Sequence, residues 1–151
     1  MSPLSDAPSA LPPGFSFAHA LEVRWRDLDL LGHVNNAMYL TYLESARIAF
    51  YRHVLGTSAL VIPWVLAEVR CRFLSPVVLD ERVVVFLGVR HVGRSSLATA
   101  FTMRADSEDG GRQVAEGEAV QVHVASDTGR PSPIPAPWRD RLLAALPHRG
   151  R

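Results

Sequence analysis

The chain has 151 residues, which is enough for one domain with a buried core. Its 16 basic residues nearly balance 15 acidic ones, so the net charge of +1 does not favour a nucleic-acid partner. All 16 basic residues are arginine, and because the sequence contains no lysine, chemistry through a lysine Schiff base is excluded. No stretch approaches the ~20 apolar residues of a membrane span, and a single cysteine, Cys71, cannot form an intramolecular disulfide.

Both ends of the chain are expected to lie outside the folded domain. Residues 1–16 are rich in Pro, Ser and Ala and predict a flexible tail; we expect one domain over 17–146 and a short C-terminal tail over 147–151. The N-terminus lacks the basic and apolar regions of a secretory signal, so we expect a cytoplasmic protein that does not associate with membranes.

The first regular elements surround an acidic turn. Apolar and charged residues alternate over 18–26, with Leu21, Val23 and Trp25 on one face, which predicts a half-buried strand. After the turn at 27–34, Asn35 is a good N-cap for a helix that runs to about Leu55. Gly56 suits the left-handed residue that ends many helices.

This helix is apolar around most of its circumference, so we expect it to be buried and wrapped by strands. A hairpin loop is expected at 107–111 and a short closing helix at 138–146. Four strands joined by short turns are expected at 64–73, 81–91, 96–104 and 113–124. The prediction is an α+β fold in which a curled, mostly antiparallel sheet surrounds one long helix, with edge strands that favour a dimer.

The acidic turn places a carboxylate beside the start of a helix. The first backbone N–H groups of a helix are free to bind an anion, so carboxylate and oxyanion site would lie side by side, as acyl transfer requires. The turn residues that could contribute are Asp27, Asp29, Gly32, His33, Asn35 and Asn36.

Four segments in order resemble the signature of hotdog-fold thioesterases, most closely the 4-hydroxybenzoyl-CoA thioesterase-like acyl-CoA thioesterases. They are DLDLLGHVNNAMY at 27–39, YLESAR at 42–47, FLSP at 73–76 and VGRSS at 92–96. The resemblance covers roughly residues 21–124 and implies a homodimer or homotetramer that hydrolyses acyl-CoA to a free acid and coenzyme A, with the pantetheine arm in a channel between subunits.

The same resemblance assigns roles to residues of this chain. It makes Asp29 the catalytic carboxylate and the backbone N–H of Asn36 the group that polarises the thioester carbonyl. Apart from the resemblance, Gly32 would supply an unusual backbone angle or let the substrate come close, and His33 is a candidate substrate contact. Arg94 and Ser95 stand where related enzymes hold the coenzyme A nucleotide, although a solvated turn arginine is an equal alternative.

Several alternatives stay open at this point. Asp29 could act as general base on water or attack the thioester carbon, and His33 could be a base, a substrate contact or a turn residue. Asp27 is expected to be structural, and Glu44 is expected to pair with Arg47 rather than to serve as a helix-borne catalytic carboxylate.

Other activities of the same fold are alternatives to acyl-CoA hydrolysis. The segment at 27–36 resembles plant acyl-carrier-protein thioesterases too, although Leu31 stands where they have Asn. A module that binds acyl thioesters without turnover is a further alternative, and hydratase chemistry would need a closer His–carboxylate pair than His33 and Glu44 offer. No His or Cys spacing suggests a metal, so we expect neither metal nor cofactor beyond coenzyme A as part of the substrate.

Overall fold

The computed structural model describes residues 10–58, 61–106 and 111–148. A 3₁₀ turn, Trp25–Asp27, precedes the long helix. The other elements in chain order are β1 (Phe17–Glu22), α1 (Asn36–Leu55), β2 (Trp64–Phe73), β3 (Arg82–Val92), β4 (Ser96–Asp106), β5 (Arg112–His123) and α2 (Ala136–Ala144).

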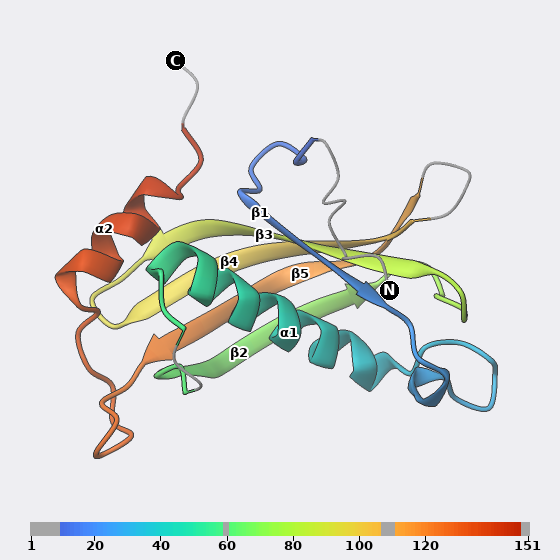
Figure 1. Cartoon of the computed structure of the whole chain (residues 1–151), viewed down its shortest axis with the longest axis horizontal. Coiled ribbons are helices and arrows are strands. Elements are labelled where there is room, and N and C mark those ends of the chain that lie inside the picture. The colour runs from blue at the N-terminus through green and yellow to red at the C-terminus, as the bar shows by residue number, and fades with distance from the viewer. Residues whose placement is uncertain (1–9, 59–60, 107–110, 149–151) are drawn as a thin grey trace.

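The five strands form one antiparallel sheet in the order β1-β3-β4-β5-β2. The sheet curves past α1, which lies along one of its faces, and α2 packs near the C-terminal end of α1 (Figure 1). The predicted α+β hotdog architecture is therefore confirmed. Within the described chain β2 pairs with β5 alone, which leaves its other edge without a strand partner.

The core lies between α1 and the sheet. On the helix, Leu43, Ala46 and Phe50 follow one face at helical spacing and are at most 1% exposed. On β3, alternate residues such as Val83 and Val85 point toward the helix and are fully buried. The apolar face of the helix thus packs against the apolar face of the sheet, as expected when a helix and a sheet each bury one face.

Both ends of α1 are as predicted. The side chain of Asn35 accepts a hydrogen bond from the backbone N–H of Ala37 at 2.9 Å, which makes it the N-cap. Gly56 ends the helix with φ of 64°, in the left-handed region that glycine adopts without steric cost.

The expected all-round burial of α1 is wrong for the single chain. The sheet covers one side of the helix, and the opposite side is open, with Leu40 40% and Ile48 37% exposed. Apolar composition alone did not reveal this, because a helix covered on one side by its own chain and a helix covered on all sides have similar sequences.

The first strand is also shorter than the alternation at 18–26 predicted. β1 ends at Glu22, and Trp25–Asp27 form the 3₁₀ turn instead, with Arg24 as its N-cap. Asp27 accepts a hydrogen bond from the backbone N–H of Arg24 at 2.9 Å, which closes this turn and leaves Trp25 81% exposed rather than on an apolar strand face. A local side-chain bond to the backbone has overridden the strand pattern.

The remaining elements agree with the prediction to within two residues. The expected loop at 107–111 lies largely outside the described residues, as do residues 1–9 of the expected N-terminal tail. Residues 10–16 are described, and Gly14 O accepts a hydrogen bond from Arg90 at 2.6 Å. The domain boundaries stay a prediction. Among the described helices, neither is long and apolar enough to cross a membrane.

Candidate active site

The acidic turn forms a small closed loop between the 3₁₀ turn and α1. Leu28 and Val34 pair as an isolated antiparallel bridge, and the backbone N–H of Asp29 donates to His33 O at 2.9 Å. Gly32 has φ of 77°, so the chain reverses in a left-handed conformation that a side chain would strain. The presence of glycine in this motif therefore follows from the geometry of the turn.

Asp29 stabilises its own turn and still faces open space. Its Oδ1 accepts a hydrogen bond from the backbone N–H of Leu31 at 2.8 Å, which is the usual arrangement of an Asx turn. The side chain is exposed and lines a hollow of about 450 Å³. One carboxylate oxygen is therefore committed to the turn, and the group as a whole remains accessible.

The hollow has two walls of different character. The turn and the first residues of α1 form the polar wall, which includes Asp29, His33 and Asn36. The end of β2 and the connection that follows form the second wall. Its residues are Phe73, Leu74, Ser75 and Pro76.

Asn36, the first residue of α1, lines this hollow. Ala37 N–H is bonded to the Asn35 side chain, and Met38 N–H donates to Asn35 O at 2.9 Å. Within the described part of the chain the N–H of Asn36 has no hydrogen-bond partner. An unpaired donor at the positive end of a helix dipole can bind the oxygen of a polarised carbonyl.

Asp27 is buried and hydrogen-bonded within the turn, in keeping with the structural role expected for it. It is 3% exposed, and its Oδ2 accepts hydrogen bonds from the backbone N–H of Arg24 and from the Tyr42 hydroxyl at 2.7 Å. Burial and the bond to Asp27 raise the pKa of Tyr42, so this hydroxyl stays a donor. The backbone O of Asp27 also accepts from Asn35 N–H at 2.8 Å, which ties the turn to the helix start.

Arg94 and Ser95 lie elsewhere. They occupy the turn between β3 and β4, at the end of the sheet near α2, whereas the acidic turn lies at the opposite end (Figure 1). Arg94 lines a separate depression of about 360 Å³ together with Arg139. Within one chain the structure thus brings together Asp29, His33 and Asn36 but not the predicted nucleotide-binding residues.

The FLSP motif at 73–76 forms the second wall of the hollow, a role in the site that the sequence alone did not assign to these residues. Phe73 and Leu74 are 46% and 42% exposed at the hollow, and both belong to the FLSP segment that matched the family signature. Tyr39 is buried and also lines the hollow. Glu44 is exposed on α1 and is not among the residues that line it.

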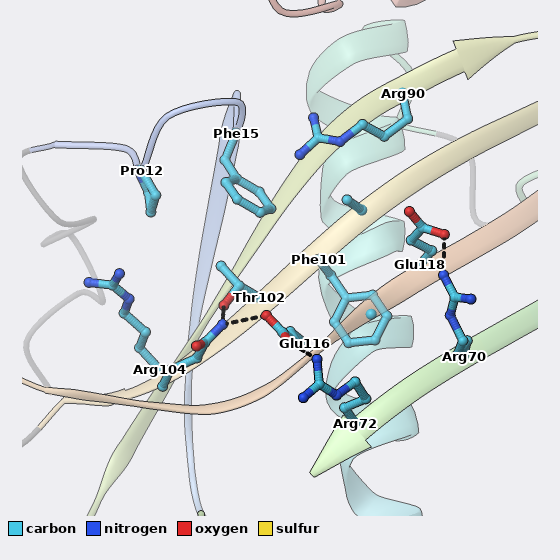
Figure 2. A pocket seen from close by; sticks show the side chains of 13 residues that line it. Pro12, Phe15, Arg70, Arg72, Arg90, Phe101, Thr102, Arg104, Glu116 and Glu118 are labelled. Carbon is cyan, nitrogen blue, oxygen red and sulfur yellow. Dashed lines mark hydrogen bonds and ion pairs between the residues drawn. The ribbon is translucent and has the colours of Figure 1, made fainter. Parts of the chain in front are cut away.

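A larger hollow, of about 610 Å³, lies on the face of the sheet turned away from α1 (Figure 2). Its arginines are partly neutralised: Arg70 pairs with Glu118 at 2.7 Å, and Arg72 pairs with Glu116 at 2.9 Å. It contains neither the acidic turn nor a helix start. We therefore assign the chemistry to the smaller hollow despite the difference in volume.

Neither a metal site nor a reactive thiol is found in the described part of the chain. No group of three His, Cys, Asp or Glu side chains that could hold a metal occurs among the described residues. The expectation that no metal is needed stays a prediction. Burial raises the pKa of the half-buried Cys71 thiol, which disfavours the reactive thiolate.

Comparison with known proteins identifies the family. The model of the thioesterase-like superfamily matches residues 23–146, which include the acidic turn, both helices and all strands except β1. The chain belongs to the thioesterase-like superfamily. The expectation of a thioesterase is therefore confirmed at the level of this family, and thioester hydrolysis is the activity that it supports.

Individual proteins are similar to this chain over most of its length. A thioesterase from Thermus thermophilus, whose crystal structure contains coenzyme A and Zn, is 35% identical with a TM-score of 0.74, over 87% of this chain and 95% of that chain. The protein YsmA of Bacillus subtilis (strain 168) is 27% identical over 89% of this chain and 87% of its own length.

The fold extends to more distant enzymes. The 4-hydroxybenzoyl-CoA thioesterase of Pseudomonas sp. strain CBS-3 superposes with a TM-score of 0.77 over 84% of this chain and 99% of that chain, at 14% identity. At this identity the similarity shows the shared hotdog fold alone. The fold of this thioesterase-family chain is thus the one that the resemblance implied.

Proposed function

We propose that this protein hydrolyses acyl-CoA thioesters to a carboxylic acid and coenzyme A at the hollow beside the acidic turn. The observation that carries the proposal is the position of an accessible carboxylate, Asp29, in the same hollow as the unpaired Asn36 N–H. Coenzyme A in the Thermus thermophilus relative supports this class of substrate.

The proposed reaction uses the two groups at different atoms of the thioester. The carbonyl oxygen accepts a hydrogen bond from Asn36 N–H, which stabilises the negative charge that grows on it as the carbon is attacked. The Asp29 carboxylate either takes a proton from the attacking water or attacks the carbon itself and is released by water. In both routes the carbon–sulfur bond breaks, and coenzyme A leaves as the thiol.

The other residues of the hollow would hold the substrate. His33 and Gly32 lie in the same turn as Asp29, and the His33 ring lines the hollow at intermediate exposure. The exposed apolar side chains of Phe73 and Leu74 suit the hydrocarbon part of an acyl group. Arg94 and Ser95 are proposed as coenzyme A contacts only in an assembly of two or more chains, because they lie at the other end of this one.

The test replaces Asp29 by Asn, which keeps a side-chain oxygen for the Leu31 N–H and removes the negative charge. We expect kcat for acyl-CoA hydrolysis to fall by about 10²–10⁴-fold, because the base or nucleophile is lost while the turn is retained. Turnover would be measured on a panel of aliphatic and aromatic acyl-CoAs and one acyl carrier protein, with a thiol reagent.

A matched control is available at Asp127, another exposed turn aspartate, whose Oδ1 accepts the N–H of Thr128 at 2.9 Å. The Asp127→Asn protein should keep the parental rate. An Asp29→Asn protein that turns over substrate as fast as the parent would refute the assignment of Asp29. If the parent protein binds acyl-CoA but releases no thiol, the protein is a binding module and not an enzyme.

A further inference from the structure

The connection between β2 and β3 forms the second wall of the hollow and has little apolar packing of its own. Of its residues at 74–81, Val77 is fully buried, while Leu74, Val78 and Leu79 are 37–42% exposed. A segment with one buried side chain needs other contacts to keep a fixed position. Those contacts come from polar groups outside the hollow.

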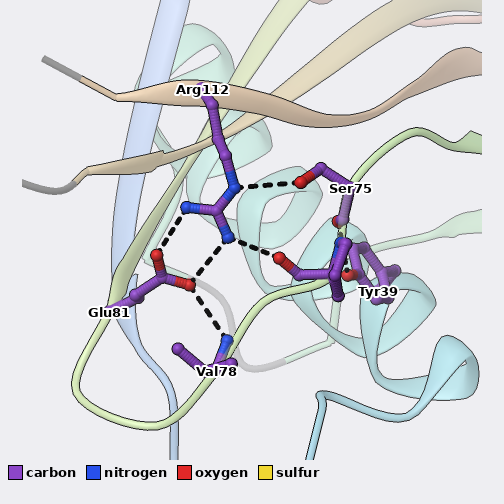
Figure 3. Close-up of polar contacts among 6 residues, drawn as sticks. Tyr39, Ser75, Val78, Glu81 and Arg112 are labelled. Atoms are coloured by element: carbon purple, nitrogen blue, oxygen red, sulfur yellow. Dashed lines mark hydrogen bonds and ion pairs between the residues drawn. The ribbon is translucent and has the colours of Figure 1, made fainter. Parts of the chain in front are cut away.

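Arg112, at the start of β5, makes four of them (Figure 3). Its Nε donates to Ser75 Oγ at 2.9 Å, and one terminal nitrogen donates to Pro76 O. The terminal nitrogens also donate to the two carboxylate oxygens of Glu81, at 2.5 and 3.0 Å. One planar guanidinium therefore joins Ser75 and Pro76, near the start of the connection, to Glu81 at its end.

Glu81 extends this arrangement. Its Oε2 accepts the backbone N–H of Val78 at 2.9 Å, and its side chain is only 13% exposed. The hydrogen bond from Arg112 outweighs burial and holds the pKa of Glu81 below its ordinary range, so the carboxylate stays charged. We call the pair Arg112 and Glu81, with their contacts to residues 75–78, the clamp.

The connection in turn contacts both halves of the proposed site. Val77 O accepts the backbone N–H of Val34 at 2.8 Å, and Val34 lies between His33 and the helix N-cap. The Tyr39 hydroxyl, from the first turn of α1, reaches Ser75 O at 3.5 Å. A displacement of residues 75–77 would therefore act on the acidic turn and on the start of the helix together.

We propose that Arg112 and Glu81 are positioning residues for thioester hydrolysis: the clamp fixes the second wall and, through Val77 and Val34, the relative placement of Asp29 and Asn36 N–H. The inference rests on the proposed function. Neither Arg112 nor Glu81 lines the hollow, so both would act through the residues that they hold. The clamp depends on the several N–H donors of the Arg112 guanidinium. A lysine at this position could keep the ionic attraction to Glu81 but not this set of hydrogen bonds.

The kinetic test compares Arg112→Gln, Glu81→Gln and Arg112→Lys with the parent below their melting temperatures. Removing the fork should lower kcat by about tenfold or more and change KM by less than about threefold, because misplacement of catalytic groups weakens transition-state stabilisation more than binding. Arg112→Lys should be intermediate. The double variant Arg112→Gln/Glu81→Gln should be no slower than the slower single variant, because both changes break one unit.

The matched control is Arg72→Gln. Arg72 also pairs with a glutamate across β2 and β5, at 2.9 Å, but on the face of the sheet away from the proposed site. This variant should keep the parental kcat and KM. If Arg112→Gln also kept both values, the clamp would be structural only and the inference would be wrong.

A second readout does not depend on activity. Amide hydrogen exchange in Arg112→Gln should become faster at 74–81 and also at 27–36, and neither segment should change in Arg72→Gln. Faster exchange at 74–81 alone would overturn the link to the acidic turn. Should the parent hydrolyse no acyl-CoA, the proposed function would fail, while the exchange at 27–36 would still decide whether the clamp positions the turn.

Discussion

At the scale of single residues, the two aspartates of the motif have opposite environments although they are two positions apart. Asp27 is buried and accepts hydrogen bonds from the Tyr42 hydroxyl and the Arg24 N–H, whereas Asp29 is exposed and faces the hollow. A carboxylate that is buried and hydrogen-bonded supports the structure, and one that is accessible beside a helix start can react with a substrate. The difference in burial therefore distinguishes the role of Asp27 from that of Asp29, which the residue type alone does not.

Replacing Tyr42 by Phe tests the role of Asp27. The change removes one of two donors from a buried carboxylate, so we expect the free energy of unfolding to fall by about 1–3 kcal/mol in urea denaturation. Tyr39→Phe is the matched control on the same helix, because its hydroxyl only reaches Ser75 O at 3.5 Å. Equal losses in the two variants would contradict a special contribution from the Asp27–Tyr42 bond.

At the scale of elements, the helix α1 serves both the core and the proposed site. Its middle buries Leu43, Ala46 and Phe50 against the sheet, and its first residue, Asn36, lines the hollow and has a backbone N–H without a hydrogen-bond partner among the described residues. The packing fixes the axis of the helix, and the Asn35 cap fixes where the helix begins. The position of the proposed oxyanion donor thus follows from core packing together with one capping side chain.

We expect Glu81, in the β2–β3 connection, to make the stability of the protein depend on pH. The pKa of Glu81 lies below its ordinary value of 4.5 in the folded protein, chiefly because Arg112 donates hydrogen bonds to it. The folded state therefore binds fewer protons at Glu81 than the unfolded chain does. Its contribution to stability is complete above the ordinary pKa and is lost as the pH falls through the lower, folded-state pKa.

Urea unfolding of the parent and of Glu81→Gln, measured between about pH 6 and about pH 3, checks this expectation. The parent should be the more stable protein at the upper end, and the difference between the two should shrink as the pH falls. Glu118→Gln, which removes an exposed glutamate paired with Arg70, is the control and should show little difference at any pH. A constant difference for Glu81→Gln would contradict the shift.

At the scale of the whole molecule, one side of the chain is left uncovered. The free edge of β2 carries Val65 and Phe73, which are 50% and 46% exposed, and α1 exposes Leu40 and Ile48. A ten-residue edge strand with apolar side chains favours pairing with another strand. We therefore predict a homo-oligomer in which two copies join along β2.

Light scattering after size exclusion tests this prediction with Val65→Arg. The parent should elute as a dimer or larger, and the charge on the β2 edge should shift the protein toward monomer, because an unpaired arginine would be desolvated in the contact. Leu143→Arg, at a residue that is 42% exposed on α2, is the control and should leave the mass unchanged. A monomeric parent would refute the prediction.

Much of the architecture could be predicted from local pattern. Asn35 and Gly56 marked the ends of α1, and alternation predicted the strands from β2 to β5, because caps and periodicity act through neighbours in sequence. The end of β1 was misjudged because the carboxylate of Asp27 closes a 3₁₀ turn at Arg24, a choice that alternation does not encode. Arg112 and Glu81 were not singled out, since 31 positions separate them in sequence.

The sequence by itself determined the family, the acidic turn and the helix that starts beside it, because these depend on residues close together along the chain. Only the tertiary structure decided that residues 73–76 form the second wall of the hollow beside Asp29, that Arg94 and Ser95 lie at the far end, and that α1 has one open side. The reason is that sheet order and helix placement join distant segments, and those contacts leave no local pattern.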